Sequence, residues 1–360
     1  MTDFIEKWIR PEIKALSSYK TQDATGLIKL DAMENPYSLP NNLKEEWLSL
    51  LQDVEVNRYP DSGALSLKNQ LKEALKIPKG MGVILGNGSD EIIQIITTGL
   101  AGNGRCVMSI DPSFVMYRMT AIYSGMNYIG VPLNERDFSL NIDHMISMMK
   151  KHNPAIIFLA NPNNPTGNLF PNDQIIQIIE SAEGIVVIDE AYGPFHKTSF
   201  LQKLESYDNL LIMGTVSKMG LAGIRLGFLA GSKKWVGEFD KIRLPYNINS
   251  LSQISANFAL KHKEVFDKQA SMICSERERL IEELKNLSGL KVYESNANFV
   301  LIRTPEGKAN SWFEQLKVSG ILVKNLHHAN GLLEDCLRIT IGTEHENNML
   351  MTSLKKISEI

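Results

Sequence analysis

The sequence predicts an α/β protein with a large domain, in which a mostly parallel sheet lies between helices, and a smaller α+β domain. Three observations support this fold class. Between residues 83 and 213, short apolar runs bounded by Gly, Pro and Asn alternate with helical segments, as in parallel sheets covered on both faces. The chain has 360 residues, which exceeds one ordinary domain. From about residue 253 the pattern changes to a charged helical stretch followed by alternating strands.

The expected elements follow one another closely along the chain. In the large domain, strands are expected at 83–85, 105–110, 127–131, 155–159, 185–188 and 210–213, and helices at 90–100, 114–124, 142–152 and 173–181. In the small domain we expect a helical stretch over 255–287, strands at 297–303 and 337–341, and a terminal helix from residue 346. Residues 1–35 are too few to fold alone and should pack against the small domain. We therefore assign 36–262 to the large domain, and 1–35 with 263–360 to the small domain.

Composition narrows the class of protein. Hydrophobic residues make up 43% of the chain and charged residues 22%, as in globular proteins with a sizeable core. The net charge of −3 gives no electrostatic case for a nucleic-acid or membrane partner. The three cysteines are scattered and read as free thiols, and the N-terminus is charged and has no apolar targeting segment. We expect a cytoplasmic protein, without a metal site because the His residues lack ligand spacing.

A lysine in a glycine-containing segment is the most informative residue. Lys218 follows Thr215 and Ser217 and precedes Arg225 by seven positions. A lysine amine can form a Schiff base with an aldehyde, and hydroxyl groups with an arginine can hold a phosphate. The segment therefore suits a phosphorylated aldehyde cofactor. The alternative is an ordinary surface lysine, since the chain contains 38 Lys and Arg.

Three residues after a strand offer a second phosphate-type contact. Gly88, Ser89 and Asp90 lie between the strand expected at 83–85 and the next helix. Backbone N–H groups and the helix dipole favour an anion at such a position. Glu91 stands where a dinucleotide-binding fingerprint needs its third glycine, and no lysine follows as in a Walker loop. The alternative is a plain helix cap with Asp90 in the first turn.

Polar residues follow two buried strands, at the edge where α/β sheets place their ligands. Asn164 belongs to an Asn-Pro-Thr-Gly turn, and Asp189 ends a strand three residues before Tyr192. A carboxylate beside a pyridine nitrogen keeps that nitrogen protonated, which makes the ring an electron sink. The alternatives are a plain connecting turn for the first segment and a metal-binding acid of Walker B type for the second.

Two further residues have two interpretations each. Phe114 follows a strand and could stack on a cofactor ring or be an ordinary core residue. Arg338 lies inside an apolar strand. Because arginine is seldom buried unless paired, it could bind a carboxylate or phosphate, or form an internal ion pair.

Taken in order, these segments resemble the fold-type I pyridoxal-phosphate aminotransferases, and within them the histidinol-phosphate aminotransferase family. The likeness runs essentially from end to end. The Asn-Pro-Thr-Gly turn and the Ser-Lys pair are typical of many aminotransferases. The more specific evidence lies in the segments 10–19, 30–36, 58–61 and 337–343.

The resemblance implies a role for each matching residue and implies pyridoxal 5'-phosphate as the cofactor. Lys218 would link to the cofactor and shuttle the proton, and Asp189 would pair with the pyridine nitrogen. Tyr192 and Asn164 would bind the ring oxygen, and Phe114 would stack on the ring. The implied phosphate ligands are Gly88, Ser89, Asp90 through its backbone, Thr215, Ser217, Arg225 and, from the neighbouring subunit of a homodimer, Tyr59. The implied substrate ligands are Tyr19, Asn35, Lys324 and Arg338.

Two departures from the family pattern affect the expected contacts. The loop between Lys218 and Arg225 is one residue shorter than in many members, and Lys324 stands near the position of a second phosphate-binding arginine. The implied reaction exchanges the amino group between L-histidinol phosphate and 2-oxoglutarate, giving imidazole-acetol phosphate and glutamate, in L-histidine biosynthesis. The alternative is another enzyme of the same fold, such as an aromatic-amino-acid aminotransferase or a phospho-amino-acid decarboxylase. A cofactor-sensing transcription regulator and an NAD-dependent dehydrogenase are disfavoured, because no DNA-binding segment and no glycine fingerprint accompany the motifs.

Overall fold

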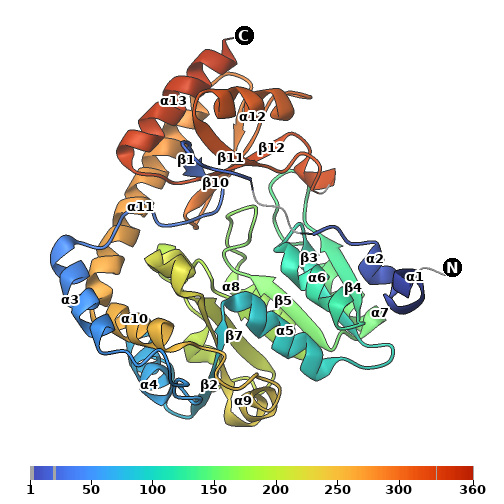
Figure 1. Cartoon of the computed structure of the whole chain (residues 1–360). Helices are drawn as coiled ribbons and strands as arrows, with labels where there is room; N and C mark the ends of the chain where they lie inside the picture. The colour runs from blue at the N-terminus through green and yellow to red at the C-terminus, as the bar shows by residue number, and fades with distance from the viewer. Residues whose placement is uncertain (1–3, 19–21, 330, 360) are drawn as a thin grey trace.

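A computed structural model describes residues 4–18, 22–329 and 331–359. It contains two sheets with helices packed around them (Figure 1). The larger sheet has the strand order β2-β8-β7-β6-β5-β3-β4. Its strands are β2 (Met81–Asn87), β3 (Cys106–Asp111), β4 (Asn127–Pro132), β5 (Ile156–Ala160), β6 (Ile185–Asp189), β7 (Leu210–Thr215) and β8 (Leu226–Ser232).

The pairing of this sheet confirms the α/β class. The pairs from β4 through β3, β5 and β6 to β7 are all parallel. Strand β8 is antiparallel to both of its neighbours, β2 and β7. The sequence analysis did not predict β8, although it predicted the other six strands within a few residues of their bounds.

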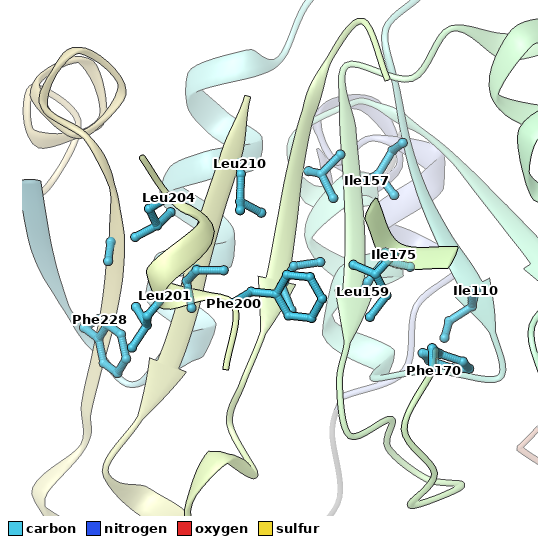
Figure 2. Close-up of a cluster of buried hydrophobic side chains, with 14 of the residues drawn as sticks. Ile110, Ile157, Leu159, Phe170, Ile175, Phe200, Leu201, Leu204, Leu210 and Phe228 are labelled. Carbon is cyan, nitrogen blue, oxygen red and sulfur yellow. The ribbon is translucent and has the colours of Figure 1, made fainter. Parts of the chain in front are cut away.

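The larger sheet has a hydrophobic core on each face, and its strands contribute to both cores because side chains alternate along each strand. Ile157 and Leu159 of β5 face one core with Phe200 and Leu201 (Figure 2), while Phe158 faces a second core on the other side. Helices cover both faces. They are α4 (Leu65–Ala74), α5 (Ser89–Leu100), α6 (Val115–Tyr123), α7 (Ile142–His152), α8 (Asn172–Ser181), α9 (Lys233–Asp240) and α10 (Ser250–Lys261). Helix α3 (Asn41–Gln52) packs against α10.

The smaller sheet has the order β1-β11-β12-β10-β9 and its own hydrophobic core. Its strands are β1 (Ile28–Leu30), β9 (Lys291–Val292), β10 (Phe299–Arg303), β11 (Ile321–Asn325) and β12 (Cys336–Thr340). The helices beside it are α11 (Lys263–Lys285), α12 (Ala309–Val318) and α13 (Glu344–Ser358). Short helical turns occur at η1 (Gly193–Phe195), η2 (Leu201–Lys203), η3 (Ser217–Leu221), η4 (Ala222–Ile224) and η5 (Gly331–Leu333).

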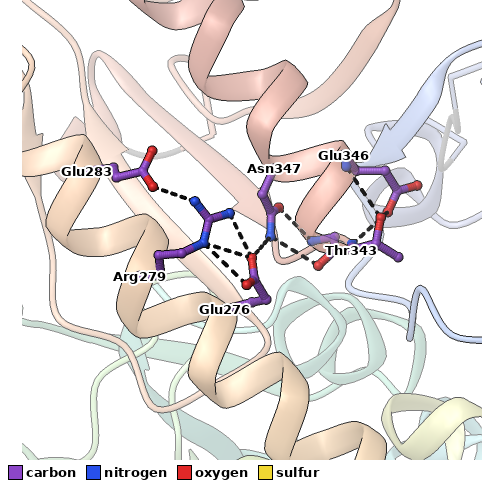
Figure 3. Close-up of polar contacts among 7 residues, drawn as sticks. Glu276, Arg279, Glu283, Thr343, Glu346 and Asn347 are labelled. Carbon is purple, nitrogen blue, oxygen red and sulfur yellow. Dashed lines mark hydrogen bonds and ion pairs between the residues drawn. The ribbon is translucent and has the colours of Figure 1, made fainter.

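Polar contacts join α11 to the start of α13 (Figure 3). The Glu276 carboxylate accepts hydrogen bonds from Arg279 at 2.9 Å and from Asn347 at 3.1 Å. Thr343 and Glu346 form a capping box that supplies partners to the first turn of α13. These contacts fix the chain that follows β12.

Two expectations about the chain differ from the structure. The helical stretch expected over 255–287 is divided at His262 into α10 and α11. Helix α10 also begins earlier than expected, because the Asn249 side chain accepts a hydrogen bond from the Ser252 N–H and caps it.

The N-terminal residues contact both parts of the fold, because β1 joins the smaller sheet and the segment before it contacts α6, a helix of the larger part. Strand β1 pairs in parallel with β11. The segment before it, α1 (Phe4–Trp8) and α2 (Pro11–Lys14), lies beside α6 (Figure 1), and Arg10 donates a hydrogen bond of 2.6 Å to the Tyr123 carbonyl. In the described parts of the chain, no helix is long and apolar enough to span a bilayer.

Candidate active site

A cavity of about 360 Å³ lies at the carboxyl ends of β5, β6 and β7. These ends meet at one edge because the three strands are parallel. The cavity brings together most of the residues that the sequence singled out: Ser89, Asp90, Phe114, Asn164, Asp189, Tyr192, Thr215, Ser217, Lys218 and Arg225.

Lys218 enters the cavity from η3, the turn that follows β7. Its Nζ donates a hydrogen bond of 3.2 Å to the carbonyl of Ala32. Burial, assisted by the positive charge of Arg338, lowers the pKa of Lys218 to about 8. About a tenth of the amine is therefore unprotonated at pH 7, far more than for an ordinary lysine, and a nucleophilic or proton-transferring amine requires this form.

Asp189 is the last residue of β6 and is almost completely buried. One carboxylate oxygen accepts a hydrogen bond of 2.9 Å from the Ala191 N–H, and the other accepts one of 2.7 Å from the Tyr117 hydroxyl. Burial raises the pKa of Asp189 to about 6, against the lowering effect of these two hydrogen bonds. The carboxylate is ionised at neutral pH and suits a cationic partner in the cavity.

The N-terminus of α5 and Arg225 form one end of the cavity. Gly88 precedes α5 with φ +81°, and a Cβ atom there would lie 2.5 Å from Nη2 of Arg225. The glycine thus lets the guanidinium cross close to the backbone, where it also lies 3.4 Å from the Asp90 carboxylate. N–H groups of a helix N-terminus beside an arginine favour an anion.

Two hydroxyl residues, Thr215 and Ser217, line the same cavity. Thr215 Oγ1 lies 2.9 Å from Ser217 Oγ and 2.8 Å from the Leu226 carbonyl oxygen, and it accepts a hydrogen bond from the Ser217 N–H at 3.1 Å. This local network fixes the turn between β7 and Lys218. The shortened loop from Lys218 to Arg225 still leads both side chains to the same cavity.

An arginine of the smaller sheet reaches the larger one. Arg338 of β12 donates hydrogen bonds of 2.6 Å to Asn164 Oδ1 and of 2.9 Å to the Asp31 carbonyl. With its oxygen engaged, the Asn164 amide nitrogen is the atom that can donate to a ligand. Tyr192 also lines the cavity, and its hydroxyl donates to the sulfur of Met33 at 3.1 Å.

Five of the described residues with expected roles do not line the cavity of this chain: Gly88 and Arg338, described above, and Asn35, Lys324 and Tyr59. The Asn35 amide donates to the Met219 carbonyl at 2.9 Å and to the Gln269 side chain at 2.8 Å, so it braces the lysine turn. Lys324 of β11 lies opposite Arg338 in the strand pairing. Tyr59 is 80% exposed and stacks on Tyr246 with a centroid distance of 4.5 Å. Tyr19 lies outside the described residues.

Sequence reasoning missed several residues around the cavity. Ala32, Met33 and Glu34 form part of its wall, and Ala160 lies opposite Asp189 in the pairing of β5 with β6. Only the folded chain brings these residues to the site. Tyr117 was also missed, although its spacing of three residues from Phe114 on a helix was a usable signal.

The residues present fit a phosphorylated pyridine aldehyde. They provide an amine with a lowered pKa, a buried carboxylate and an anion-binding end next to Gly88. The described residues include no group of three or more His, Cys, Asp and Glu that could hold a metal ion.

Comparisons with known proteins agree with this geometry. The family model for class I and II aminotransferases matches residues 25–354. Histidinol-phosphate aminotransferase 2 of Nitrosococcus oceani is 50% identical over 98% of each chain, and histidinol-phosphate aminotransferase of Chromobacterium violaceum is 45% identical over 98% of each chain. The crystal structure of the histidinol-phosphate aminotransferase from Clostridium acetobutylicum has a TM-score of 0.84 at 25% identity, covering 92% of this chain and 99% of its own. The chain belongs to the class I and II aminotransferases, and within them it is a member of the histidinol-phosphate aminotransferase family.

Proposed function

We infer that this protein is a histidinol-phosphate aminotransferase that uses pyridoxal 5'-phosphate. It exchanges an amino group between L-histidinol phosphate and 2-oxoglutarate, giving imidazole-acetol phosphate and glutamate, as a step of L-histidine biosynthesis. The observation that carries this function is Lys218, an amine with a lowered pKa in the same cavity as the buried Asp189. The 50% identity with a relative of the same name, over nearly the whole chain, supports the substrate.

We propose that the larger sheet holds the cofactor. Lys218 binds its aldehyde carbon, and Asp189 holds its pyridine nitrogen protonated. Asn164 and Tyr192 bind the ring oxygen, and Phe114 lies against the ring. The groups assigned to the phosphate are Gly88, Ser89, Asp90 through its backbone, Thr215, Ser217 and Arg225.

When bound, pyridoxal phosphate supplies an electron sink for the charge left on the substrate carbon after a proton departs. Lys218 performs the proton transfers at that carbon. Its pKa of about 8 lets the amine accept a proton and return it near neutral pH. The Lys218 amine is itself buried in the cavity, which limits the access of water to it.

The substrate's anionic groups are assigned to the smaller sheet. Arg338 is proposed to bind the carboxylate of glutamate and to assist with the phosphate of histidinol phosphate. Lys324 lies opposite Arg338 on the neighbouring strand, so the two cations share one face of the sheet. A lysine binds phosphate as a point charge, without the bidentate geometry of arginine. Asn35 and Tyr19 are proposed to lie near the substrate. Asn35 would act indirectly, because its amide holds the turn that contains Lys218 through the Met219 carbonyl.

We propose a homodimer in which Tyr59 reaches the cofactor phosphate of the other subunit. Tyr59 is exposed and lies outside the cavity of its own chain. Leu48, Val56 and Leu65, which are near Tyr59 in the sequence, are also exposed apolar side chains, and a partner subunit would cover such side chains. We also propose a cytoplasmic location and the division into a large domain, 36–262, and a small domain, 1–35 with 263–360.

A spectral titration of the purified protein tests the function. The cofactor's visible absorption should be lost on addition of glutamate and should return on addition of imidazole-acetol phosphate. If no cofactor absorption is present, the cofactor assignment is wrong. If glutamate removes the absorption and imidazole-acetol phosphate does not restore it, the substrate assignment is wrong. Release of carbon dioxide from a phospho-amino acid would favour the decarboxylase alternative.

A further inference from the structure

Tyr117 is fully buried on α6 and does not line the active-site cavity. Its hydroxyl donates a hydrogen bond of 2.7 Å to Oδ2 of Asp189, the residue assigned to the cofactor's pyridine nitrogen. The backbone N–H of Ala191 occupies the other carboxylate oxygen. Tyr117 is therefore placed to act on the cofactor through Asp189.

Two aromatic contacts fix the Tyr117 ring. It stacks on Phe158 of β5 with a centroid distance of 4.7 Å and an interplanar angle of 2°. It also meets Phe114 edge to face at 5.7 Å and 87°. Phe158 and Ala160 are two residues apart on β5, so their side chains point to the same face of the sheet. Ala160 is paired with Asp189 on β6, and Phe158 therefore lies on the face where Tyr117 approaches Asp189.

The hydroxyl opposes the effect of burial on Asp189. Burial favours the neutral carboxyl, and the Tyr117 hydrogen bond is the largest influence in the opposite direction. The pKa of Tyr117 itself is raised well above its ordinary value, mainly by burial, so the hydroxyl stays protonated and remains a donor. The other titratable groups that face this pair are Asp90, Lys218, Tyr192 and Tyr128.

We propose that Tyr117 is a positioning residue for the reaction: its hydroxyl keeps the Asp189 carboxylate ionised and aimed at the cofactor's pyridine nitrogen. Phe114 and Tyr117 lie three residues apart at the start of α6, and therefore on one side of it. The same helix turn thus presents one aromatic ring to the cofactor and one hydroxyl to the carboxylate behind it. The inference rests on the proposed role of Asp189.

The test replaces Tyr117 by Phe, which keeps the stacked ring and removes only the hydroxyl. The pKa of Asp189 is measured in the cofactor-free protein by ¹³C NMR of labelled Asp carboxyls, with the signal assigned by its loss in Asp189→Asn. The pKa should rise by about one unit, because a hydrogen bond to a charged group is lost. Cofactor affinity is compared at pH 6.5, about half a unit above the Asp189 pKa of about 6 in the unchanged protein. At this pH the Tyr117→Phe variant should bind the cofactor severalfold more weakly than the unchanged protein.

Two further variants separate positioning from a structural role. Tyr128→Phe removes the hydroxyl of another, partly buried tyrosine and should leave the Asp189 pKa unchanged. Replacing Tyr117 by a fluorotyrosine of the same shape strengthens the donor, and it should shift the Asp189 pKa downward. An unchanged pKa in both Tyr117 variants overturns the inference. This measurement needs no substrate, so a wild-type protein inactive with histidinol phosphate would contradict the proposed function and leave the inference intact.

Discussion

Lys218 shows how burial prepares a single residue for chemistry. The low pKa results from its surroundings, first burial and then the charge of Arg338. Lys218→Ala should reduce turnover by at least about 10³-fold, because the proton-transferring amine is lost. The variant should still bind the cofactor without a covalent bond. Turnover assays and absorption spectra before and after gel filtration check both statements.

Lys68 provides the matched control for this substitution. Burial also lowers the pKa of Lys68, but this lysine lies outside the cavity. Lys68→Ala should therefore retain turnover and the covalently bound cofactor. If Lys218→Ala were as active as Lys68→Ala, the wrong lysine would have been assigned.

The raised pKa of Asp189 leads us to expect that cofactor binding depends on pH. Its pKa is raised to about 6, so the group is mostly ionised above pH 6 and mostly neutral below it. Because only the ionised form stabilises a protonated pyridine, cofactor affinity should fall as the pH decreases from 7.5 to 5. The slope must be compared with Asp189→Asn, since phosphate groups also titrate near pH 6. Equal slopes in both proteins would contradict the role of Asp189.

At the scale of elements, the central parallel strands β3, β5, β6 and β7 were predictable because each is a short apolar run buried on both faces. Strand β6 ends at Asp189, as the sequence indicated. Strand β8 was missed because only Phe228, Leu229 and Ala230 lie between its two glycines, without the β-branched residues that mark β2. The sequence motifs did identify the cavity residues that lie at or after strand ends, such as Asn164, Asp189 and Lys218. Ala32 and Ala160 carry no chemical signal and become part of the site only through the fold.

The turn before α5 offers a test at this scale. In Gly88→Ala the added Cβ would lie 2.5 Å from Arg225 Nη2, at a backbone φ of +81° that side chains rarely adopt. Arg225 must therefore move, and the dissociation constant of the cofactor should rise by about tenfold or more, as expected for loss of a charge-assisted hydrogen bond. Equilibrium titration of the cofactor-free protein measures the change.

Gly237→Ala is a suitable comparison for that variant. Gly237 lies in α9, and a Cβ there meets nothing within 4 Å. This substitution should leave cofactor binding unchanged and stabilise the helix by about 1 kcal/mol. If Gly88→Ala bound the cofactor as tightly as Gly237→Ala, the contact between Gly88 and Arg225 would not matter for phosphate binding.

At the scale of the whole molecule, the site depends on the two sheets being joined. Arg338 of the smaller sheet contacts the turn that carries Asn164 and the segment after β1. The Lys218 amine contacts the same N-terminal segment through the Ala32 carbonyl. A substrate anion that binds Arg338 would therefore compete with or change the hydrogen bonds that Arg338 makes to Asn164, which lines the cavity, and to the Asp31 carbonyl.

The proposed homodimer can be tested by restoring activity between two inactive chains. Tyr59→Ala lacks the residue assigned to the neighbouring site, and Lys218→Ala lacks the amine of its own site. If Tyr59 acts across the interface, a mixed dimer contains one complete site and one doubly defective site, because a symmetric dimer exchanges equivalent residues. Equal amounts of the two chains, dissociated and reassembled together, should then recover about a quarter of wild-type activity. If Tyr59 acts within its own chain, neither site of the mixed dimer is complete and activity does not rise. Mixing the two variants without dissociation is the control, and light scattering establishes the mass of the assembly in each sample.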